Sequence, residues 1–277
     1  MNQLKMKQWR FKISLLLAVF LSGCSTSPTG RSQLMLVSPE QAITASKEAY
    51  IQTLKPLSDK GKVDNDPIIS RRVRQITGRL ISQAILQYPY TSNWSWSVKV
   101  IDDPESVNAW CMAGGQMAIY TGLLQKINPT DDELAQVMAH EVSHALANHT
   151  AEKMSVAMAA QLGMVAVAIS VKNSENSGLA LTGAALAAKV AIELPNSRIA
   201  EREADRMGIE LAAKAGYNPN AAASLWAKMG KVGGKTLPEF MSTHPSPGNR
   251  QETLRQLAAS MMPLYNVAAK HPVYPLR

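Results

Sequence analysis

The sequence predicts a mainly helical domain with a small β-sheet, an α+β fold. Helical patterns recur between residues 38 and 262, and the clearest is 68–86, where apolar residues at helical spacing alternate with arginines. Residues 94–100 alternate strictly between apolar and polar side chains, which is typical of a strand with one buried face. The apolar run 134–147 carries two histidines one helical turn apart. These observations give the fold class, and the histidines indicate where its chemistry lies.

The composition is that of an ordinary globular protein. The chain has 277 residues, of which 46% are apolar and 18% charged, enough for one substantial domain or two small ones. Its formal charge of +8 would be compatible with nucleic-acid binding. Half of that excess comes from basic residues at positions 5–12, and no basic patch with interleaved aromatic residues follows them. We therefore exclude nucleic acid as a partner.

Residues 1–23 are expected to be a signal peptide. A basic start is followed by the apolar run 13–21, which is too short to span a bilayer as a helix. The run ends in Leu-Ser-Gly-Cys24, which resembles the lipobox of bacterial lipoproteins. The resemblance implies cleavage before Cys24 and lipidation of its thiol, so that acyl chains anchor the protein to the membrane. Ser25, rather than aspartate, at the next position favours the outer membrane, with the protein facing the periplasm.

Three segments are expected after the signal peptide. Residues 24–37 are polar and are expected to be a lipidated tether, and residues 38–262 form the predicted folded domain. Residues 263–277 contain three prolines and are expected to be an extended tail. Cys111, the second of two cysteines, is most simply a small core residue. With Cys24 acylated no intramolecular disulfide can form, so a bound metal is the only cross-link available.

Helix boundaries follow from local patterns. Thr130 and Glu133 form a capping box at the start of the histidine-bearing helix. The Ala-rich runs 154–171 and 179–194 predict a helical hairpin packed on the domain, with a membrane-facing or substrate-facing role as the alternative. Further helices are expected at 38–55, from about 196, at 219–228 and at 248–262.

The histidine-bearing helix contains the pattern H-E-x-x-H, formed by His140, Glu141 and His144. At about 100° per residue, the two histidines lie about 40° apart on one helix face and can share a tetrahedral zinc ion. Glu141 sits beside them, placed to take a proton from an attacking water molecule. The pattern is typical of zinc hydrolases, most often peptidases. The alternative is a surface helix with two ordinary histidines.

A third ligand is expected from a second helix. His149 lies about 180° around the helix from His140, so we expect it to be a surface or capping residue. Glu201 and Asp205 are four residues apart and share a helix face. Glu201 can complete a His₂Glu site, and Asp205 can accept the second N–H of a ligand histidine. Glu203 points away and is expected to be solvated. The alternative is an acidic helix start without a metal.

The segment 108–122 predicts two strands joined by a turn at Gly114-Gly115. A strand beside the metal helix can bind an extended substrate by strand addition, and a purely structural hairpin is the equal alternative. Further along, His244 lies in a proline-bounded loop before a helix, held in place as a catalytic group would be.

Together these residues resemble the zinc metallopeptidases of the CAAX prenyl protease and HtpX-like family. Within it the chain looks most like the soluble bacterial lipoprotein branch, related to the mitochondrial metalloendopeptidase that overlaps with the m-AAA protease. The chain has an Ala-rich hairpin in place of the transmembrane helices of the membrane members, so prenylated substrates are not expected. The matching motifs are Asn108-Ala with Gly114-Gly115, His140-Glu-Val-Ser-His144, Ser197-Arg-x-x-Glu201-x-Glu-Ala-Asp205 and His244-Pro-Ser-x-x-x-Arg250.

The resemblance implies a zincin fold of the gluzincin type over residues 38–262, with one Zn²⁺ per chain. It implies that His140, His144 and Glu201 bind the zinc, that Glu141 is the general base and that Asp205 supports a ligand. It also places Asn108 and the strand that follows, with Gly114 and Gly115, along the substrate backbone, and His244 with Arg250 near the oxyanion.

The sequence therefore predicts a zinc-dependent endopeptidase of the bacterial cell envelope. Its expected substrates are misfolded or misassembled envelope proteins, because a strand-addition site binds backbone more than sequence. The alternative is an envelope chaperone or assembly factor that retains the zinc site, with cleavage secondary. His244 is expected either to stabilise the oxyanion or to occupy the open zinc position at rest.

Overall fold

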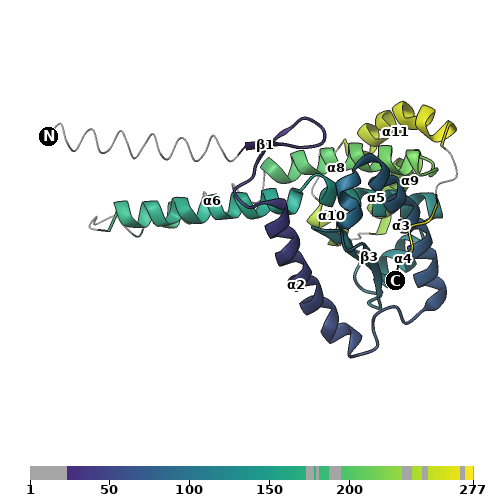
Figure 1. The fold of residues 1–277 in the computed structure, drawn as a ribbon, viewed down its shortest axis with the longest axis horizontal. Helices are drawn as coiled ribbons and strands as arrows, with labels where there is room; N and C mark the ends of the chain where they lie inside the picture. Colours follow the sequence, from purple (N-terminus) through teal and green to yellow (C-terminus); the bar gives the residue numbers. More distant parts are fainter. Residues whose placement is uncertain are drawn as a thin grey trace. The chain divides into compact units, whose positions relative to one another are not determined.

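The computed structural model describes residues 24–172, 178, 181–186, 195–232, 239–244, 249–268 and 272–276. The expected signal peptide, residues 1–23, lies outside them. The chain divides into two compact units, one made of Met1–Ser38 with Ala151–Ile192 and the other of Pro39–Thr150 with Glu193–Arg277. The second unit contains the predicted site, and its helices and small sheet confirm the predicted α+β class (Figure 1).

The elements of the second unit are α2 (Pro39–Ser58), α3 (Pro67–Gln87), the 3₁₀ turn η1 (Pro89–Asn93), β3 (Ser97–Ile101), β4 (Ala109–Met112), β5 (Gln116–Tyr120), α4 (Thr121–Ile127), α5 (Asp131–Leu146), α8 (Pro195–Lys214), α9 (Ala221–Val232), α10 (Glu239–Thr243) and α11 (Arg250–Asn266). The helix α6 (His149–Ser170) begins in this unit and continues into the other.

The sheet of the second unit has the order β3-β5-β4. β4 and β5 pair antiparallel across the predicted Gly114-Gly115 turn, where both glycines have a positive φ. β3 pairs parallel with β5, an arrangement that the alternation of apolar residues did not predict. β3 also starts at Ser97, later than the predicted position 94, because residues 94–96 form a bend and a connecting segment between η1 and the strand. β4 therefore lies at the edge of the sheet, next to α5.

α5 is the central helix of the second unit. Thr130 and Glu133 form the predicted capping box at its start, with Glu133 N–H donating to Thr130 Oγ1 at 3.2 Å. Nearly all of its residues are buried, because it packs against α8, α3, α9 and β4 (Figure 1). The apolar side chains of α5 belong to the main core, together with Val73, Ile76, Leu80, Met117, Ile119, Leu211 and Met229.

The close approach of α8 to α5 depends on one glycine. A Cβ at Gly208 would lie 3.0 Å from the backbone Cα and N of His140. Backbone atoms cannot rotate out of the way as a side-chain end can, so a side chain at this position would push the two helices apart. The contact fixes the position of α8 against the turn of α5 that carries His140. It thereby brings the acidic residues one and two turns before Gly208 to the metal helix.

The C-terminal part differs from the prediction in its boundaries. α11 runs to Asn266 with Pro263 inside it, although the sequence predicted an end at Met262 because proline usually breaks a helix. Residues 272–276 have no regular secondary structure, and Tyr274 N–H donates to Gly78 O on α3 at 3.0 Å. Its aromatic ring packs against the main core, so this part of the tail belongs to the domain surface.

The first unit contains β1 (Cys24–Thr26), β2 (Ser32–Leu34) and most of α6. β1 and β2 form an antiparallel hairpin within the expected tether. Arg31 on this hairpin donates two hydrogen bonds to Glu152 of α6, at 2.7 and 2.6 Å. Among the described residues, α6 is the one helix long and apolar enough to cross a membrane by length and composition. The second arm of the predicted hairpin lies largely outside the described residues.

Candidate metal centre

Four side chains converge where α5, α8 and the end of α10 meet. His140 and His144 come from α5, Glu201 from α8, and His244 from the residue after α10. One donor atom from each lies within 4.8 Å of all the others. The fold thus brings together the three ligands expected from the sequence, and His244 joins them.

The donor spacing fits a metal ion. His140 Nε2 lies 3.0 Å from His144 Nε2 and 3.3 Å from Glu201 Oε2, and His144 Nε2 lies 3.4 Å from Glu201 Oε1. Donors at about 2.0–2.1 Å from a tetrahedral zinc ion are about 3.3 Å apart. The three distances therefore match those that a shared zinc ion requires.

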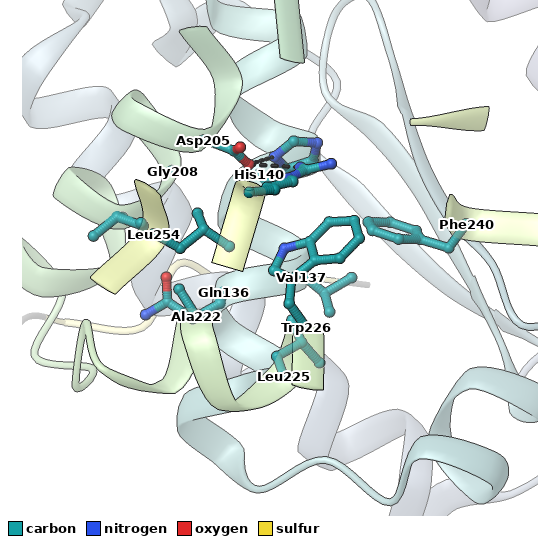
Figure 2. A pocket seen from close by; sticks show the side chains of 12 residues that line it. Gln136, Val137, His140, Asp205, Gly208, Ala222, Leu225, Trp226, Phe240 and Leu254 are labelled. Atoms are coloured by element: carbon teal, nitrogen blue, oxygen red, sulfur yellow. Dashed lines mark hydrogen bonds and ion pairs between the residues drawn. The ribbon is translucent and has the colours of Figure 1, made fainter. Parts of the chain in front are cut away.

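Asp205 and Arg250 support this triangle from behind. His140 Nδ1 donates to Asp205 Oδ1 at 3.1 Å, as predicted, which turns its Nε2 toward the other ligands (Figure 2). Arg250 Nη2 lies 2.6 Å from Asp205 Oδ1 and 3.5 Å from Glu201 Oε2, and its guanidinium stacks 3.8 Å from the centre of the Trp226 ring. Arg250 is therefore buried against the two carboxylates, and its Nη1 donates to the main-chain carbonyl of His244 at 3.2 Å.

Burial and the neighbouring carboxylates shift the pKa of His140 in opposite directions. Burial lowers the pKa of His140, but hydrogen bonds with Asp205 and Glu201 outweigh it, and the pKa rises to about 9. The same interactions with His140 and Arg250 lower the pKa of Asp205 in spite of its burial. A metal ion must displace the proton of His140, so binding should release a proton at neutral pH.

Glu141 lies beside the ligands on the side of the sheet edge. Its carboxylate accepts a hydrogen bond from the backbone N–H of Cys111 in β4, and its Oε1 lies 3.3 Å from His244 Nε2. Burial, helped by the negative charge of Glu201, raises the pKa of Glu141 to about 8. A carboxyl group with a pKa near neutrality can both take up and release a proton.

His244 is held with one nitrogen toward the site. Its Nδ1 lies 3.0 Å from Phe240 O, a pure acceptor, so Nδ1 carries the proton and Nε2 offers a lone pair. The ring stacks on Phe240 with 4.5 Å between centroids. Burial and the nearby charge of His140 lower the pKa of His244 to about 4, which keeps the imidazole neutral.

Two residues that the sequence placed on the surface are buried beside the ligands. His149 Nδ1 lies 2.8 Å from His144 Nδ1, and His149 Nε2 lies 3.1 Å from Glu203 Oε2. The expectation of a surface His149 and a solvated Glu203 is therefore wrong, since they are only 7% and 6% exposed. The angle drawn for His149 assumed one continuous helix, but α5 ends at Leu146 and Asn148 takes a left-handed conformation before α6 begins. For Glu203, α8 is covered by α3, α5 and α11 and has little solvated face.

The three residues expected along the substrate lie around β4. Asn108 is buried just before the strand, and its Oδ1 accepts from Ala109 N–H at 2.9 Å. A Cβ at Gly114 would lie 2.9 Å from Ile43 Cγ2 on α2, and one at Gly115 would overlap the Trp96 ring. These contacts and the positive φ angles give both glycines a structural reason, independent of any substrate.

A small cavity lies behind His140. Its volume is about 20 Å³, enough for a single water molecule but too small for a substrate. Trp226 and Phe240 lie on one side of it, and Gly208 and Asp205 on the other (Figure 2). This cavity is therefore not a substrate site.

Comparison with known proteins places this site in a family. The chain is 31% identical to the mitochondrial metalloendopeptidase OMA1 of Bos taurus, over 92% of this chain and 51% of the relative. It is 36% identical to the OMA1 of Schizosaccharomyces pombe, over 74% and 57%, and 26% identical to the beta-barrel assembly-enhancing protease of Escherichia coli, over 76% and 43%.

The chain spans about half the length of the curated relatives it matches. The model of peptidase family M48 matches residues 67–258, which include every residue of the site described above. The predicted metallopeptidase fold is thereby confirmed, and the chain belongs to peptidase family M48.

Proposed function

We propose that the chain is a zinc-dependent endopeptidase of the bacterial cell envelope, with one zinc ion held by His140, His144 and Glu201. The observation that carries this proposal is the triangle of donor atoms 3.0–3.4 Å apart, in which His140 and Glu201 are buried and His144 is partly exposed. Bound zinc would supply a Lewis acid that lowers the pKa of a water molecule and polarises a substrate carbonyl. Family membership and relatives named metalloendopeptidases support the same function.

Glu141 is the proposed general base. Its carboxylate lies beside the ligand cluster, 3.3 Å from His244 Nε2, and is held by the N–H of Cys111. In this position it would take the proton of the attacking water molecule and pass it to the leaving amine. Asp205 and Arg250 would keep His140 and Glu201 in place during the reaction, because they contact those side chains directly.

The edge strand β4 is the proposed substrate platform. It ends the sheet, and its residues Trp110, Cys111 and Met112 are half-buried. The N–H that holds Glu141 belongs to this strand, so a peptide added to the edge of the sheet would run past the general base. Asn108 would lie at the start of that edge.

His244 has two proposed roles that one substitution separates. Its Nε2 belongs to the cluster of possible ligands, which supports a resting state in which it fills the fourth position on zinc. In the second role its Nε2 would carry a proton, which it lacks in the resting arrangement, and would donate it to the oxyanion of the reaction. His244→Ala should raise casein cleavage by the full-length protein if the histidine blocks the site at rest. A loss of activity, at unchanged zinc content, would show the second role, since removing one oxyanion donor costs about 10²–10³-fold in rate elsewhere.

The proposed substrates are misfolded or misassembled proteins of the envelope. Two bacterial relatives carry names that refer to β-barrel assembly, which supports a role in envelope quality control. We further propose that the protein is one of the lipoprotein members of the family, anchored through Cys24 in the outer membrane and facing the periplasm. The apolar surface of α6 lies in the same unit as Cys24 and is compatible with a membrane location.

The proposal is tested by casein cleavage with the full-length protein in detergent, with zinc measured in the same samples. Glu141→Gln keeps the shape of the side chain and should reduce the rate by about 10²–10⁴-fold without loss of zinc. Glu210→Gln makes the same chemical change on α8, where Glu210 pairs with Lys214, and should leave both unchanged.

Other results would separate the alternatives. A wild-type protein that contains no zinc would contradict the ligand assignment. Zinc without cleavage, in both wild type and His244→Ala, would support the alternative function of a chaperone or assembly factor. Rescue of a deletion phenotype by Glu141→Gln would point the same way.

A further inference from the structure

A chain of buried polar contacts leads away from His144. Its Nδ1 lies 2.8 Å from Nδ1 of His149, and Nε2 of His149 lies 3.1 Å from Glu203 Oε2. His149 and Glu203 are both nearly inaccessible to solvent. His149 and Glu203 are not members of the cluster of possible metal ligands, and the proposed reaction gives neither of them a role.

The direction of the protons along this chain can be worked out. Each hydrogen bond needs one donor and one acceptor, and a neutral imidazole has one of each. If Glu203 accepts from His149 Nε2–H, then His149 Nδ1 is an acceptor and His144 Nδ1 carries a proton. His144 Nε2 then presents a lone pair to the ligand cluster. The reverse order would place the proton on His144 Nε2 and prevent it from binding a metal.

The other ligand histidine has the same arrangement with a shorter chain. His140 Nδ1 contacts Asp205 directly at 3.1 Å, which fixes its Nε2 as the metal-facing atom. The two Nε2 atoms lie 3.0 Å apart, so without a metal the proton of His140 lies between them, and a bound cation would replace it. His149 with Glu203 does for His144 what Asp205 does for His140.

We propose that His149 and Glu203 are positioning residues that hold His144 with its proton on Nδ1 and its Nε2 ready for the metal. The inference rests on the proposed zinc site and adds a role for two residues outside it. The break between α5 and α6 at Asn148 is part of the device, because it turns His149 back toward His144. Loss of such a supporting partner lowers metal affinity by about 10–100-fold in other metalloproteins.

The first test measures zinc affinity of the full-length protein in detergent by competition with a chelator. His149→Leu should bind zinc about 10–100-fold more weakly than wild type. His149→Gln should recover most of the affinity, because its amide can accept from His144 and donate to Glu203 at the same time. Ser143→Ala is the matched control: this buried hydroxyl on α5 bonds only to Ala139 O of its own helix, and the change should leave zinc affinity unaltered.

The outcomes distinguish the inference from the proposed function. Wild-type zinc binding with unchanged affinity in His149→Leu would overturn the role of His149 and leave the zinc site standing. Absence of zinc from the wild type would overturn the proposed function itself. Equal losses in His149→Leu and His149→Gln would show that the ring is needed only for packing.

A second measurement uses the wild-type protein, so it does not depend on a variant that lacks the buried histidine. The chain has five histidines, so the tautomers in the zinc-loaded wild type can be read from nitrogen-15 NMR of the imidazoles. We expect a proton on Nδ1 of His144 and on Nε2 of His149. A proton on Nδ1 of His149 would overturn the proposed order.

Discussion

At the scale of single residues, the site depends on which nitrogen of each histidine carries a proton. Asp205 accepts from His140, Glu203 accepts from His149, and Phe240 O faces His244 Nδ1. In each case an oxygen takes the hydrogen bond on the side away from the ligand cluster. These hydrogen bonds thus turn Nε2 of His140, His144 and His244 toward the ligand cluster, although a metal must still displace the proton that His140 holds.

Among these residues, replacement of Asp205 is expected to disturb the site most. It accepts from His140 and pairs with Arg250, and all three are buried. Asp205→Asn should weaken zinc binding by about 10–100-fold and lower the free energy of unfolding by about 3–5 kcal/mol, because Arg250 loses its main counter-charge. Chelator competition and urea unfolding measure the two effects.

The matched control is Asp131→Asn at the start of α5. Asp131 pairs with Arg72 at 2.7 Å, but this pair is exposed, and its loss should cost about 0–1 kcal/mol with no change in zinc affinity. If the two variants were equally stable, the buried network around Asp205 would contribute nothing beyond a surface ion pair.

Individual residues also show how far the sequence predicts the site. Within one helix, spacing is reliable, and the side chains of His140, His144, Glu201 and Asp205 meet as their periodicity predicts. Between helices it fails, as with His149, whose direction depends on a backbone reversal at Asn148. An asparagine after a helix end is a known signal of a left-handed cap, and it could have marked this break.

At the scale of elements, the site depends on how closely α8 approaches α5. Gly208 faces the backbone of His140, and the donors of the two helices lie within a few ångströms of each other. The sequence predicted both helices but not the distance between them. A glycine within a helical pattern does not indicate which part of the protein it packs against. The parallel pairing of β3 with β5 escaped prediction for a similar reason, since alternation gives the faces of a strand and not its neighbours.

Gly208→Ala should separate the two helices. The added methyl would stand 3.0 Å from the backbone of His140, and such overpacking typically costs about 1–3 kcal/mol. The better helix propensity of alanine offsets about 1 kcal/mol of this. We expect a net loss of stability and weaker zinc binding, because Glu201 moves away with α8. Thermal unfolding and chelator competition test both.

Gly230→Ala in α9 provides the comparison. A Cβ there meets nothing within 4 Å, so only the helix propensity remains and the variant should be more stable than wild type by up to about 1 kcal/mol. The two glycine variants are therefore expected to differ in sign. A stabilised Gly208→Ala with normal zinc affinity would show that α8 can move without disturbing the ligands.

At the scale of the whole molecule, the proposed membrane location rests on features of the first unit. The first unit joins the expected lipid attachment site to α6, through the bonds of Arg31 with Glu152 and of Gln33 with the same carboxylate. Large apolar side chains of α6, among them Leu162, Val165 and Ile169, are exposed. Two membrane contacts are therefore possible in one unit, the acyl chains on Cys24 and the apolar helix.

Replacing Cys24, the proposed lipidation site, separates these two contacts. Cys24→Ala cannot be acylated at this position, and without acyl chains the protein should leave the washed membrane fraction of cells and lose labelling by a fatty-acid analogue. Ser25→Ala keeps Cys24 and should retain both the membrane location and the label.

If Cys24→Ala loses the label but stays in the membrane after a carbonate wash, a segment other than the lipid must hold it. In that case a charge introduced by Ile169→Asp, on the exposed and apolar part of α6, should release it, because a charged side chain within the bilayer costs about 2.5–3.5 kcal/mol. Release by Cys24→Ala alone would instead assign the anchor to the acyl chains and leave the apolar surface of α6 to contacts made outside the bilayer.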